Sequence, residues 1–284
     1  MARTARELVL GLHRTRVDEH LLTAARDLGV EHLDTAYNYG GFRSLDRLAA
    51  LRAPCAFKIT SKVGFFRSPD SAAEHSLTPA RLYSAVEDTV ARLGAPLDVI
   101  LLHNPERAGP ASPLDFPHAL ASACHSLQRA VRDGLARRWG LSIWKPQALL
   151  DHLQGLILEP DVLMTRVGLS VSASDMAAIE SCRDALTWPG IEHRGMAPLG
   201  GASAPTLLRA TDLSSFVHGD ATNAQAGVRI SFDLPPVDLV TLGTSNAVHL
   251  RYAVMACAMD VDDERLTVYR GLLRALARDP DARG

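Results

Sequence analysis

Eight short apolar segments, spread over the whole chain, alternate with stretches of helical periodicity. The apolar segments are predicted strands, at 7–12, 30–34, 56–62, 98–103, 138–143, 161–167, 191–197 and 238–243. The helical patterns follow them, at about 17–28, 43–52, 78–93, 117–133, 146–154, 174–186 and 246–259. A strand followed by a helix, repeated eight times, is typical of a closed parallel barrel. We therefore predict one α/β domain over residues 1–284, a (β/α)8 (TIM) barrel.

An open, doubly wound sheet is the alternative for this pattern. Sheets of that kind that bind dinucleotides usually carry a GxGxxG turn after the first strand, and none follows 7–12. The helix at 78–93 has the clearest boundaries, because Thr78 is expected to cap it with its side chain and Gly94 to end it. We expect a long loop with a short helix at 200–236 and a C-terminal helix at 262–277.

Composition excludes several classes of function. The chain has 284 residues, 47 % hydrophobic and 22 % charged, which is typical of a globular protein with a sizeable core. A net charge of −2 argues against nucleic acid as a partner. No apolar run approaches the roughly 18 residues of a membrane span, and the first residues do not resemble a signal peptide, so we expect a cytoplasmic protein. The cysteines show neither CxxC nor metal-ligand spacing, so we expect reduced, mostly buried thiols and no metal site: Cys55, Cys124, Cys182 and Cys257.

Polar residues close three neighbouring predicted strands. Asp34 ends the second strand, Lys62 the third and His103 the fourth, and Tyr39 follows Asp34 by five residues in a loop. Each residue taken alone has an ordinary structural explanation, such as a turn or a satisfied hydrogen bond. In a barrel, however, the carboxyl ends of the strands form the active site, so these four side chains are expected to converge there and to alter one another's pKa values.

The four groups together suit acid catalysis on a carbonyl compound. A tyrosine hydroxyl with a pKa near 10 is a poor acid at neutral pH, and the Lys62 ammonium is expected to lower the pKa of Tyr39 toward the working range. Asp34 is expected to keep Lys62 protonated as its counter-ion. His103 is expected to donate a hydrogen bond to the substrate oxygen. The Gly40–Gly41 pair is expected to turn the loop so that the Tyr39 hydroxyl faces inward.

Five segments resemble the aldo-keto reductase family in order and spacing. They are "LDTAYNYGG", "ITSKVGF", "DVILLHNPE", "GLARRWGLSIW" and "LVTLGTSNAVHL", within a similarity that spans roughly residues 7–256. The resemblance implies that Asp34, Tyr39, Lys62 and His103 form a catalytic tetrad with Tyr39 as the proton donor. It also implies hydride transfer between a nicotinamide cofactor, usually NADP(H) with NAD(H) as the alternative, and an organic aldehyde or ketone or the corresponding alcohol.

The segment "LGTSNAVHL" predicts a phosphate site. Three residues after the last strand are expected to expose backbone N–H groups: Gly243, Thr244 and Ser245. Asn246 can cap the following helix, whose positive dipole end favours an anion, although an ordinary glycine turn is the alternative. The resemblance places His249 where many relatives keep an arginine for the ribose phosphate, and Arg251 lies two residues further on. The preference between NADP(H) and NAD(H) therefore stays open.

Several positions that hold the cofactor in the family differ in this chain. By the resemblance, the cofactor site includes Ser142, Met196 and Leu199, with Met196 in place of a stacking aromatic residue. The other replacements are Ile143 for Asn, Met164 or Thr165 for Gln, and Tyr252 and Ala253 for the Glu and Asn that hold the adenine. Each lost contact is worth about 1 kcal/mol, so cofactor binding is expected to be weakened or even lost. A lyase, dehydratase or isomerase that works without nicotinamide is the second hypothesis, and a catalytically silent binding subunit is the third.

A mostly apolar rim is expected around the substrate. The candidates are Tyr37, Phe65, Asn104 and Trp144, with Phe42 and Phe66 nearby. This composition favours a medium-sized organic carbonyl compound over a small charged acid. Tyr37 does not match the tetrad, and we interpret it as a loop or pocket-wall residue.

Overall fold

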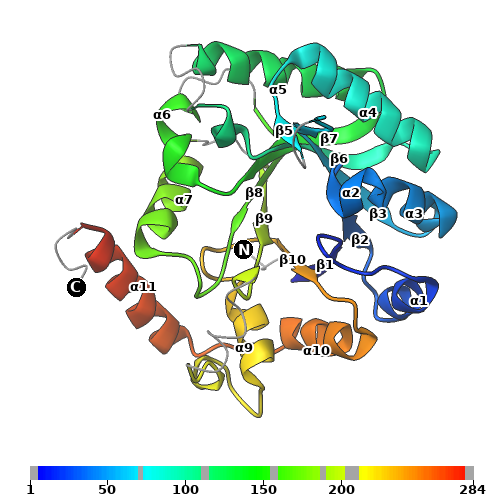
Figure 1. The fold of residues 1–284 in the computed structure, drawn as a ribbon. Helices are drawn as coiled ribbons and strands as arrows, with labels where there is room; N and C mark the ends of the chain where they lie inside the picture. The colour runs from blue at the N-terminus through cyan, green and yellow to red at the C-terminus, as the bar shows by residue number, and fades with distance from the viewer. Residues whose placement is uncertain are drawn as a thin grey trace.

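Eight parallel strands close into a barrel in this computed structural model, which describes residues 6–69, 73–109, 115–153, 159–185, 190–201 and 211–278 (Figure 1). The order around the barrel is β1-β10-β9-β8-β7-β6-β3-β2. The strands are β1 (Glu7–Gly11), β2 (His32–Asp34), β3 (Lys58–Val63), β6 (Leu97–His103), β7 (Ala136–Ile143), β8 (Val162–Arg166), β9 (Glu192–Met196) and β10 (Leu239–Gly243). Since β1 pairs with both β10 and β2, the sheet has no free edge. The predicted (β/α)8 barrel is confirmed, and the open sheet is wrong.

Helices surround the barrel on the outside (Figure 1). They are α1 (Glu19–Asp27), α2 (Tyr39–Phe42), α3 (Ser44–Ala50), α4 (Pro79–Leu93), α5 (Phe116–Arg132), α6 (Leu150–Leu153), α7 (Ala173–Ala185), α9 (Asn223–Ile230), α10 (Ala247–Cys257) and α11 (Asp263–Arg278). A short hairpin after β3, formed by β4 (Phe65–Phe66) and β5 (Glu74–His75), was not predicted. The short helix expected within 200–236 is α9, and 202–210 lie outside the described residues. In the described part of the chain, no helix is long and apolar enough to cross a membrane.

The start of α4 differs from the prediction in one detail. Thr78 occupies the N-cap position, but its side chain accepts no hydrogen bond from the helix. The Thr78 hydroxyl instead accepts a hydrogen bond of 2.9 Å from Ser76 Oγ, which belongs to the preceding turn. The predicted side-chain cap is therefore wrong, because a local turn contact takes its place. Gly94 ends the helix as expected, with a φ of +70°.

The hydrophobic core has two parts that matter for the site. The larger part lies between the barrel and its helices and includes Cys124 and Cys182, whereas Cys55 is exposed. A small cluster of Val99, Leu101, Val162, Met164 and partly buried Met196 gathers side chains of β6, β8 and β9 that share one face of their strands. Because neighbouring residues in a strand face opposite sides, Met164 and not Thr165 lies in this layer.

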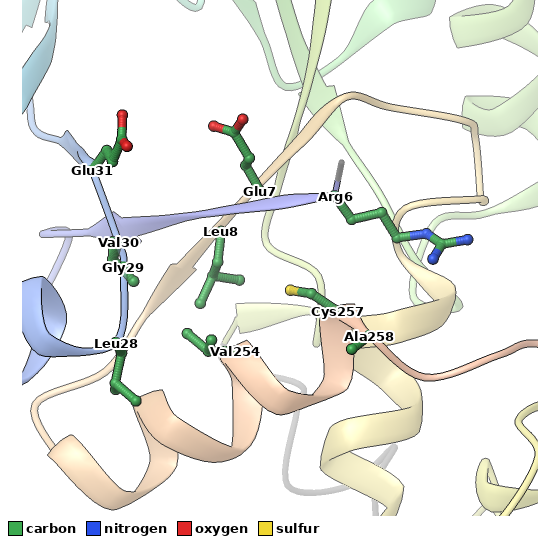
Figure 2. Close-up of a pocket in the computed structure, with 10 residues that line it drawn as sticks. All are labelled: Arg6, Glu7, Leu8, Leu28, Gly29, Val30, Glu31, Val254, Cys257 and Ala258. Atoms are coloured by element: carbon green, nitrogen blue, oxygen red, sulfur yellow. The ribbon is translucent and has the colours of Figure 1, made fainter. Parts of the chain in front are cut away.

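A pocket of about 470 Å³ opens at the amino end of the barrel, beside β1 and α10 (Figure 2). Its lining includes Glu7, Leu28, Glu31, Val254 and Cys257. The predicted tetrad lies at the carboxyl ends of β2, β3 and β6. This pocket is therefore at the opposite end of the barrel from the candidate site.

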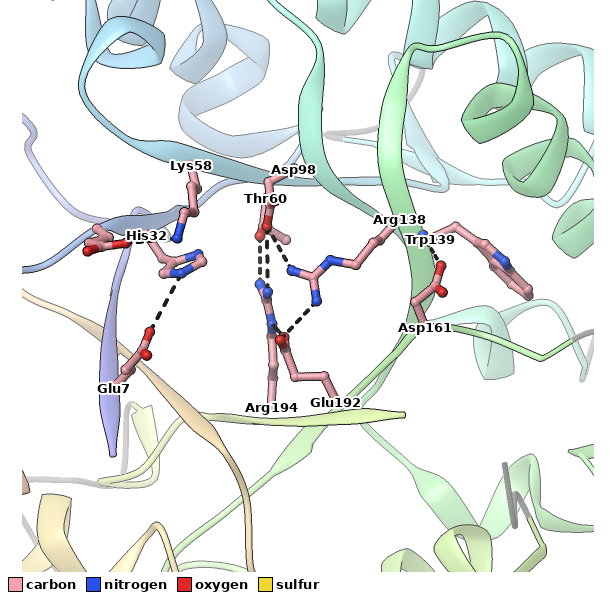
Figure 3. A network of polar contacts seen from close by, with 11 residues as sticks. Glu7, His32, Lys58, Thr60, Asp98, Arg138, Trp139, Asp161, Glu192 and Arg194 are labelled. Carbon is pink, nitrogen blue, oxygen red and sulfur yellow. Dashed lines mark hydrogen bonds and ion pairs between the residues drawn. The ribbon is translucent and has the colours of Figure 1, made fainter. Parts of the chain in front are cut away.

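Paired charges occupy the interior of the barrel near its amino end (Figure 3). Arg194 is fully buried and donates hydrogen bonds to Glu192 and, at 2.7 Å, to Thr60 Oγ1. Arg138 bridges Glu192 and Asp98, each at 2.9 Å. The network leaves the Arg194 guanidinium compensated by two carboxylates, since Asp98 lies 3.9 Å from it.

Replacing Glu192 should destabilise the protein strongly. The variant Glu192→Ala leaves the buried Arg194 without its hydrogen-bonded carboxylate, which should lower the free energy of unfolding by about 3 kcal/mol in urea titrations. The control is Glu31→Gln, which removes a 2.8 Å ion pair with Lys58 between two exposed side chains and should change little. Equal losses for the two variants would contradict the structural role of the network.

Candidate active site

The four predicted site residues come together at the carboxyl end of the barrel. Lys62 Nζ donates hydrogen bonds to Asp34 Oδ2 at 2.5 Å and to the Thr35 carbonyl at 3.0 Å. The Lys62 ammonium also lies 5.2 Å from the centroid of the Tyr39 ring. The side chains of Lys62 and Asp34 are only 1 % and 5 % exposed. A buried, paired cation therefore lies beside the tyrosine, as the sequence predicted, and His103 completes the set from the end of β6.

The loop after β2 turns sharply to bring Tyr39 to this position. Gly40 and Gly41 both adopt left-handed backbone, with φ of +59° and +64°. A side chain at either residue would be strained there, which explains the glycine pair. The turn is tied to the next helix by a 2.8 Å hydrogen bond between the hydroxyls of Thr35 and Ser44.

Aromatic and histidine rings enclose His103. Its ring centroid lies 6.0 Å from that of Tyr39 and 4.8 Å from that of Phe65. His75, on the unpredicted hairpin, donates a hydrogen bond of 2.9 Å from Nε2 to the His103 carbonyl. The hairpin thus holds the end of β6, and Phe65 lies against His103 of the tetrad. A role for Phe65 in the substrate pocket stays a prediction.

The pKa of Tyr39 differs from the prediction. Burial raises the pKa of the Tyr39 hydroxyl above its ordinary value of 10, and the lowering effect of the Lys62 ammonium is smaller. The expected net lowering is therefore wrong for the free protein, because removal of the phenolate from water outweighs one nearby cation. Tyr39 is held as a neutral phenol, which is the form that can donate a proton.

The other two ionisable partners keep the protonation states that the chemistry needs. Burial opposes the charge on Lys62, but the Asp34 carboxylate and Tyr39 more than offset it and raise the pKa of Lys62. Burial and the Lys62 charge hold the pKa of His103 well below 6.5. His103 is therefore a neutral imidazole with one N–H to donate, and its Nδ1 atom contacts no hydrogen-bonding group in the described structure.

Acid should destabilise the protein through its histidines. Burial is the largest cause of a lowered pKa for five of them: His13, His32, His75, His103 and His193. For His193 the pKa falls to about 4. Below about pH 6.5 the unfolded chain binds protons that the folded protein does not, so stability present above that pH is lost as the pH falls. Each histidine contributes up to about 1.4 kcal/mol per pH unit. Urea titrations between about pH 7.5 and pH 5 should show this fall, and a constant free energy of unfolding would contradict it.

Two residues that the sequence reasoning missed also belong to this region. The ring of His13 lies 4.9 Å from that of Tyr39. His13 comes two residues after β1, so the same attention to strand ends could have found it. Glu106 is buried and accepts hydrogen bonds from the N–H groups of Trp144 at 2.9 Å and Lys145 at 3.1 Å. No local pattern marks this contact, because it joins two different loops.

Two further pocket candidates, Trp144 and Asn104, follow the ends of β7 and β6. Trp144 is 40 % exposed, and the Arg166 guanidinium lies 5.1 Å from the Trp144 ring centroid. The Asn104 N–H donates to the Ser142 carbonyl at 2.8 Å, so Asn104 continues the pairing of β6 with β7. These positions are compatible with a pocket at the carboxyl end of the barrel.

Tyr37 lies in a different environment from Tyr39. Its ring centroid lies 5.8 Å from that of Phe42 and 6.3 Å from that of Phe66, and the Asp88 carboxylate of α4 is close enough to act on its hydroxyl. Burial, together with Asp88, raises the pKa of Tyr37. The structure thus separates the two tyrosines, and a role for Tyr37 in substrate binding stays a prediction.

Comparison with known proteins agrees with this geometry. The model of the aldo/keto reductase family matches residues 13–272. The chain belongs to the aldo/keto reductase family. Members of this family are typically NAD(P)H-dependent oxidoreductases, and the family uses nicotinamide cofactors.

Individual relatives of this aldo/keto reductase are distant. Pyridoxine 4-dehydrogenase of Escherichia coli (strain K12) is 27 % identical over 260 residues, which cover 89 % of this chain and 86 % of the relative. The structure resembles that of a Pseudomonas aeruginosa protein assigned to the aldo-keto reductases, with a TM-score of 0.65, 25 % identity and coverage of 88 % and 89 % of the two chains. An aldo-keto reductase from Bacillus halodurans in its holo form has a TM-score of 0.71 at 17 % identity, with coverage of 95 % and 92 %, which shows the fold.

The predicted nicotinamide end of the site contains a polar group with only a weak partner. Ser142 is buried, and its hydroxyl contacts the Met196 sulfur at 3.9 Å, which is a weak acceptor. The Ser142 hydroxyl is therefore available to a carboxamide. Met196 has no flat ring to stack on a nicotinamide, and Leu199 packs against the larger core. The residues present fit a nicotinamide with fewer contacts than the resemblance implies.

The predicted phosphate end of the site keeps more of its expected features. Asn246 caps α10 as predicted, since its Oδ1 accepts hydrogen bonds from Val248 N at 2.8 Å and His249 N at 3.4 Å. Ser245 Oγ accepts a hydrogen bond of 2.8 Å from Arg16 N, which ties the β10 loop to the β1 loop. The candidate phosphate residues are exposed or partly exposed: Gly243, Thr244, Ser245, His249 and Arg251. Hydroxyls, backbone N–H groups and a guanidinium suit a phosphate.

Proposed function

We propose that this aldo/keto reductase reduces an organic aldehyde or ketone with NAD(P)H, or oxidises the corresponding alcohol. The observation that carries the proposal is the buried Lys62–Asp34 pair beside the Tyr39 ring, with the ring of the neutral His103 6.0 Å from that of Tyr39. The bound nicotinamide group supplies the hydride for the carbonyl carbon.

The side chains of the chain itself account for the proton. The His103 N–H donates a hydrogen bond to the substrate oxygen and so orients the carbonyl group. The Tyr39 hydroxyl gives its proton to that oxygen, and the Lys62 ammonium stabilises the phenolate that remains. Asp34 holds Lys62 in place through the 2.5 Å hydrogen bond. General acid catalysis of this kind contributes about 10²–10⁴-fold to a rate.

We assign cofactor binding to Ser142 at the nicotinamide end and to the loop after β10 at the phosphate end. The first test is a titration of the protein with NADPH and with NADH, following the quenching of tryptophan fluorescence. Saturable quenching supports an oxidoreductase. No quenching up to millimolar concentration would reject it.

Arg251 provides the test of cofactor preference. Arg251 is exposed on α10 near the phosphate loop, so we assign the ribose phosphate of NADP(H) to it together with His249. The variant Arg251→Ala should raise the Kd for NADPH about tenfold or more, the value of a charge-assisted hydrogen bond, and leave the Kd for NADH nearly unchanged. Equal effects on the two cofactors would contradict this assignment.

A non-redox lyase, dehydratase or isomerase is the second candidate function. The observation in its favour is a second imidazole, that of His13, whose ring centroid lies 4.9 Å from that of Tyr39. Met196 and Ile143 also replace residues that the family resemblance assigns to nicotinamide binding. This function requires turnover of a carbonyl compound without any nicotinamide cofactor. A silent binding subunit would show neither turnover nor cofactor binding.

The substrate class that we propose is a medium-sized organic carbonyl compound or alcohol. Phe65 and Trp144 supply apolar surface near the tetrad. The name of the Escherichia coli relative gives pyridoxine as its substrate. Pyridoxine with NADP⁺ or NAD⁺ is therefore the first alcohol to assay.

A further inference from the structure

A second pocket, of about 290 Å³, lies at the amino end of the barrel, away from the tetrad. It is bounded by the last turn of α7, the start of β9 and the segment before β10. Phe232 and Val237 give it apolar walls, and its charged or titratable lining is Arg6, Arg183, His193 and Asp238. Its volume is at the lower end of the range for small-molecule sites.

Arg183 is the unusual residue of this pocket. Its Nε and Nη2 atoms are buried and form no hydrogen bond within the described structure. Burial lowers the pKa of Arg183 to about 10, so the guanidinium is still charged at neutral pH. Donors that leave water without a new acceptor cost free energy, and a charged donor costs more. An anion in the pocket would supply the missing acceptors.

The neighbouring groups do not satisfy Arg183. Asp238 Oδ2 accepts the His193 backbone N–H at 2.9 Å, and Asp238 acts on Arg183 only as a nearby charge. Glu180, on the same helix, forms an ion pair with Arg274, whose Nη2 lies 3.1 Å from Glu180 Oε1. Burial and the Arg183 charge lower the pKa of His193 to about 4, so His193 is neutral at pH 7.

Arg6 adds a second cation to the pocket. Its side chain lines both amino-end pockets, and Figure 2 shows its guanidinium pointing away from Glu7, Leu8 and Cys257 of the larger one. With His193 neutral, the charged groups of the lining are the guanidinium groups of Arg6 and Arg183 and the carboxylate of Asp238. Among these, the unpartnered N–H groups of Arg183 offer planar donors that suit an oxyanion.

We propose that this pocket binds a phosphate group, either free phosphate or a small phosphate monoester, with Arg183 as its main ligand. The site is separate from the cofactor loop, because it lies at the amino ends of β9 and β10 whereas that loop follows the carboxyl end of β10. The inference does not depend on the catalytic activity.

Thermal unfolding of the full chain tests the proposal. Inorganic phosphate should raise the Tm relative to sodium chloride at equal ionic strength, because a ligand that binds only the folded state stabilises it. The variant Arg183→Met should lose most of this rise, because the candidate phosphate loop after β10 accounts for only the remainder. The comparison variant, Arg251→Ala, changes an arginine beside that loop and should keep most of the rise.

Three results would overturn the proposal. They are the absence of a phosphate-dependent rise in the wild type, a rise as large in Arg183→Met as in the wild type, and a rise that is lost entirely in Arg251→Ala. If Arg183→Met does not fold, Arg183→Lys is titrated with phosphate by calorimetry instead. This variant keeps the positive charge but loses the planar pair of guanidinium N–H donors. Phosphate binding at least about tenfold weaker than in the wild type supports the site, and unchanged binding overturns it. Glycerol 3-phosphate serves as the second probe, since tighter binding than that of inorganic phosphate identifies a monoester and equal or weaker binding identifies the free ion.

Discussion

Replacing Tyr39 by phenylalanine should lower kcat by about 10³-fold or more for the carbonyl substrate. The variant Tyr39→Phe keeps the ring that packs 4.9 Å from His13 and 6.0 Å from His103 but removes the only proton that we assign to the substrate oxygen. Because the hydroxyl acts in the chemical step, the Kd of the cofactor should stay nearly constant. Steady-state kinetics and the fluorescence titration measure the two effects separately.

The matched control for this variant is Tyr37→Phe. It makes the same change two residues away, where the ring packs against Phe42 and Phe66 and the Asp88 carboxylate acts on the hydroxyl. The kcat of Tyr37→Phe should stay within about threefold of wild type, because a contact of Tyr37 with the substrate would change KM instead. Unchanged turnover by Tyr39→Phe would reject Tyr39 as the acid under either enzymatic hypothesis.

Replacing Lys62 should affect both activity and stability. The variant Lys62→Met removes the cation that stabilises the Tyr39 phenolate, so kcat should fall about 10²-fold or more. It also leaves the Asp34 carboxylate, 5 % exposed, without its ion-pair partner. An uncompensated buried charge costs about 3–5 kcal/mol, which urea titration at neutral pH should detect.

Two further variants separate these effects. Lys58→Met changes an exposed lysine on the same strand, paired with the exposed Glu31, and should alter neither quantity. The double variant Lys62→Met with Asp34→Asn removes both charges, so it should regain most of the stability while kcat stays low. Full activity in the double variant would contradict a catalytic role for the Lys62 charge.

Much of the fold was predictable because it depends on local pattern. The eight strands lie within a few residues of their predicted ranges, since apolar runs bounded by turn residues mark buried parallel strands directly. The meeting of Asp34, Lys62 and His103 was also predictable, because parallel strands of one barrel present their carboxyl ends at the same side. Tyr39 required one further local feature, the left-handed Gly40–Gly41 turn.

The β4–β5 hairpin was not predictable in the same way. Its strands have two residues each, too few to show any periodicity. Yet it carries Phe65, which packs against the ring of His103, and His75, which donates a hydrogen bond to the His103 carbonyl. The surroundings of His103 therefore came only from the tertiary structure.

The sequence by itself determined the barrel and the identity of the four groups at its carboxyl end, because strand periodicity and strand-terminal residues are local properties. The tertiary structure decided the pKa values of those groups, since burial depends on every element packed around a side chain. Burial reverses the expected direction of the pKa shift of Tyr39 and keeps His103 neutral. Burial also lowers the pKa of Arg183 to about 10, in a pocket formed by segments far apart in the chain, but the guanidinium stays charged at neutral pH.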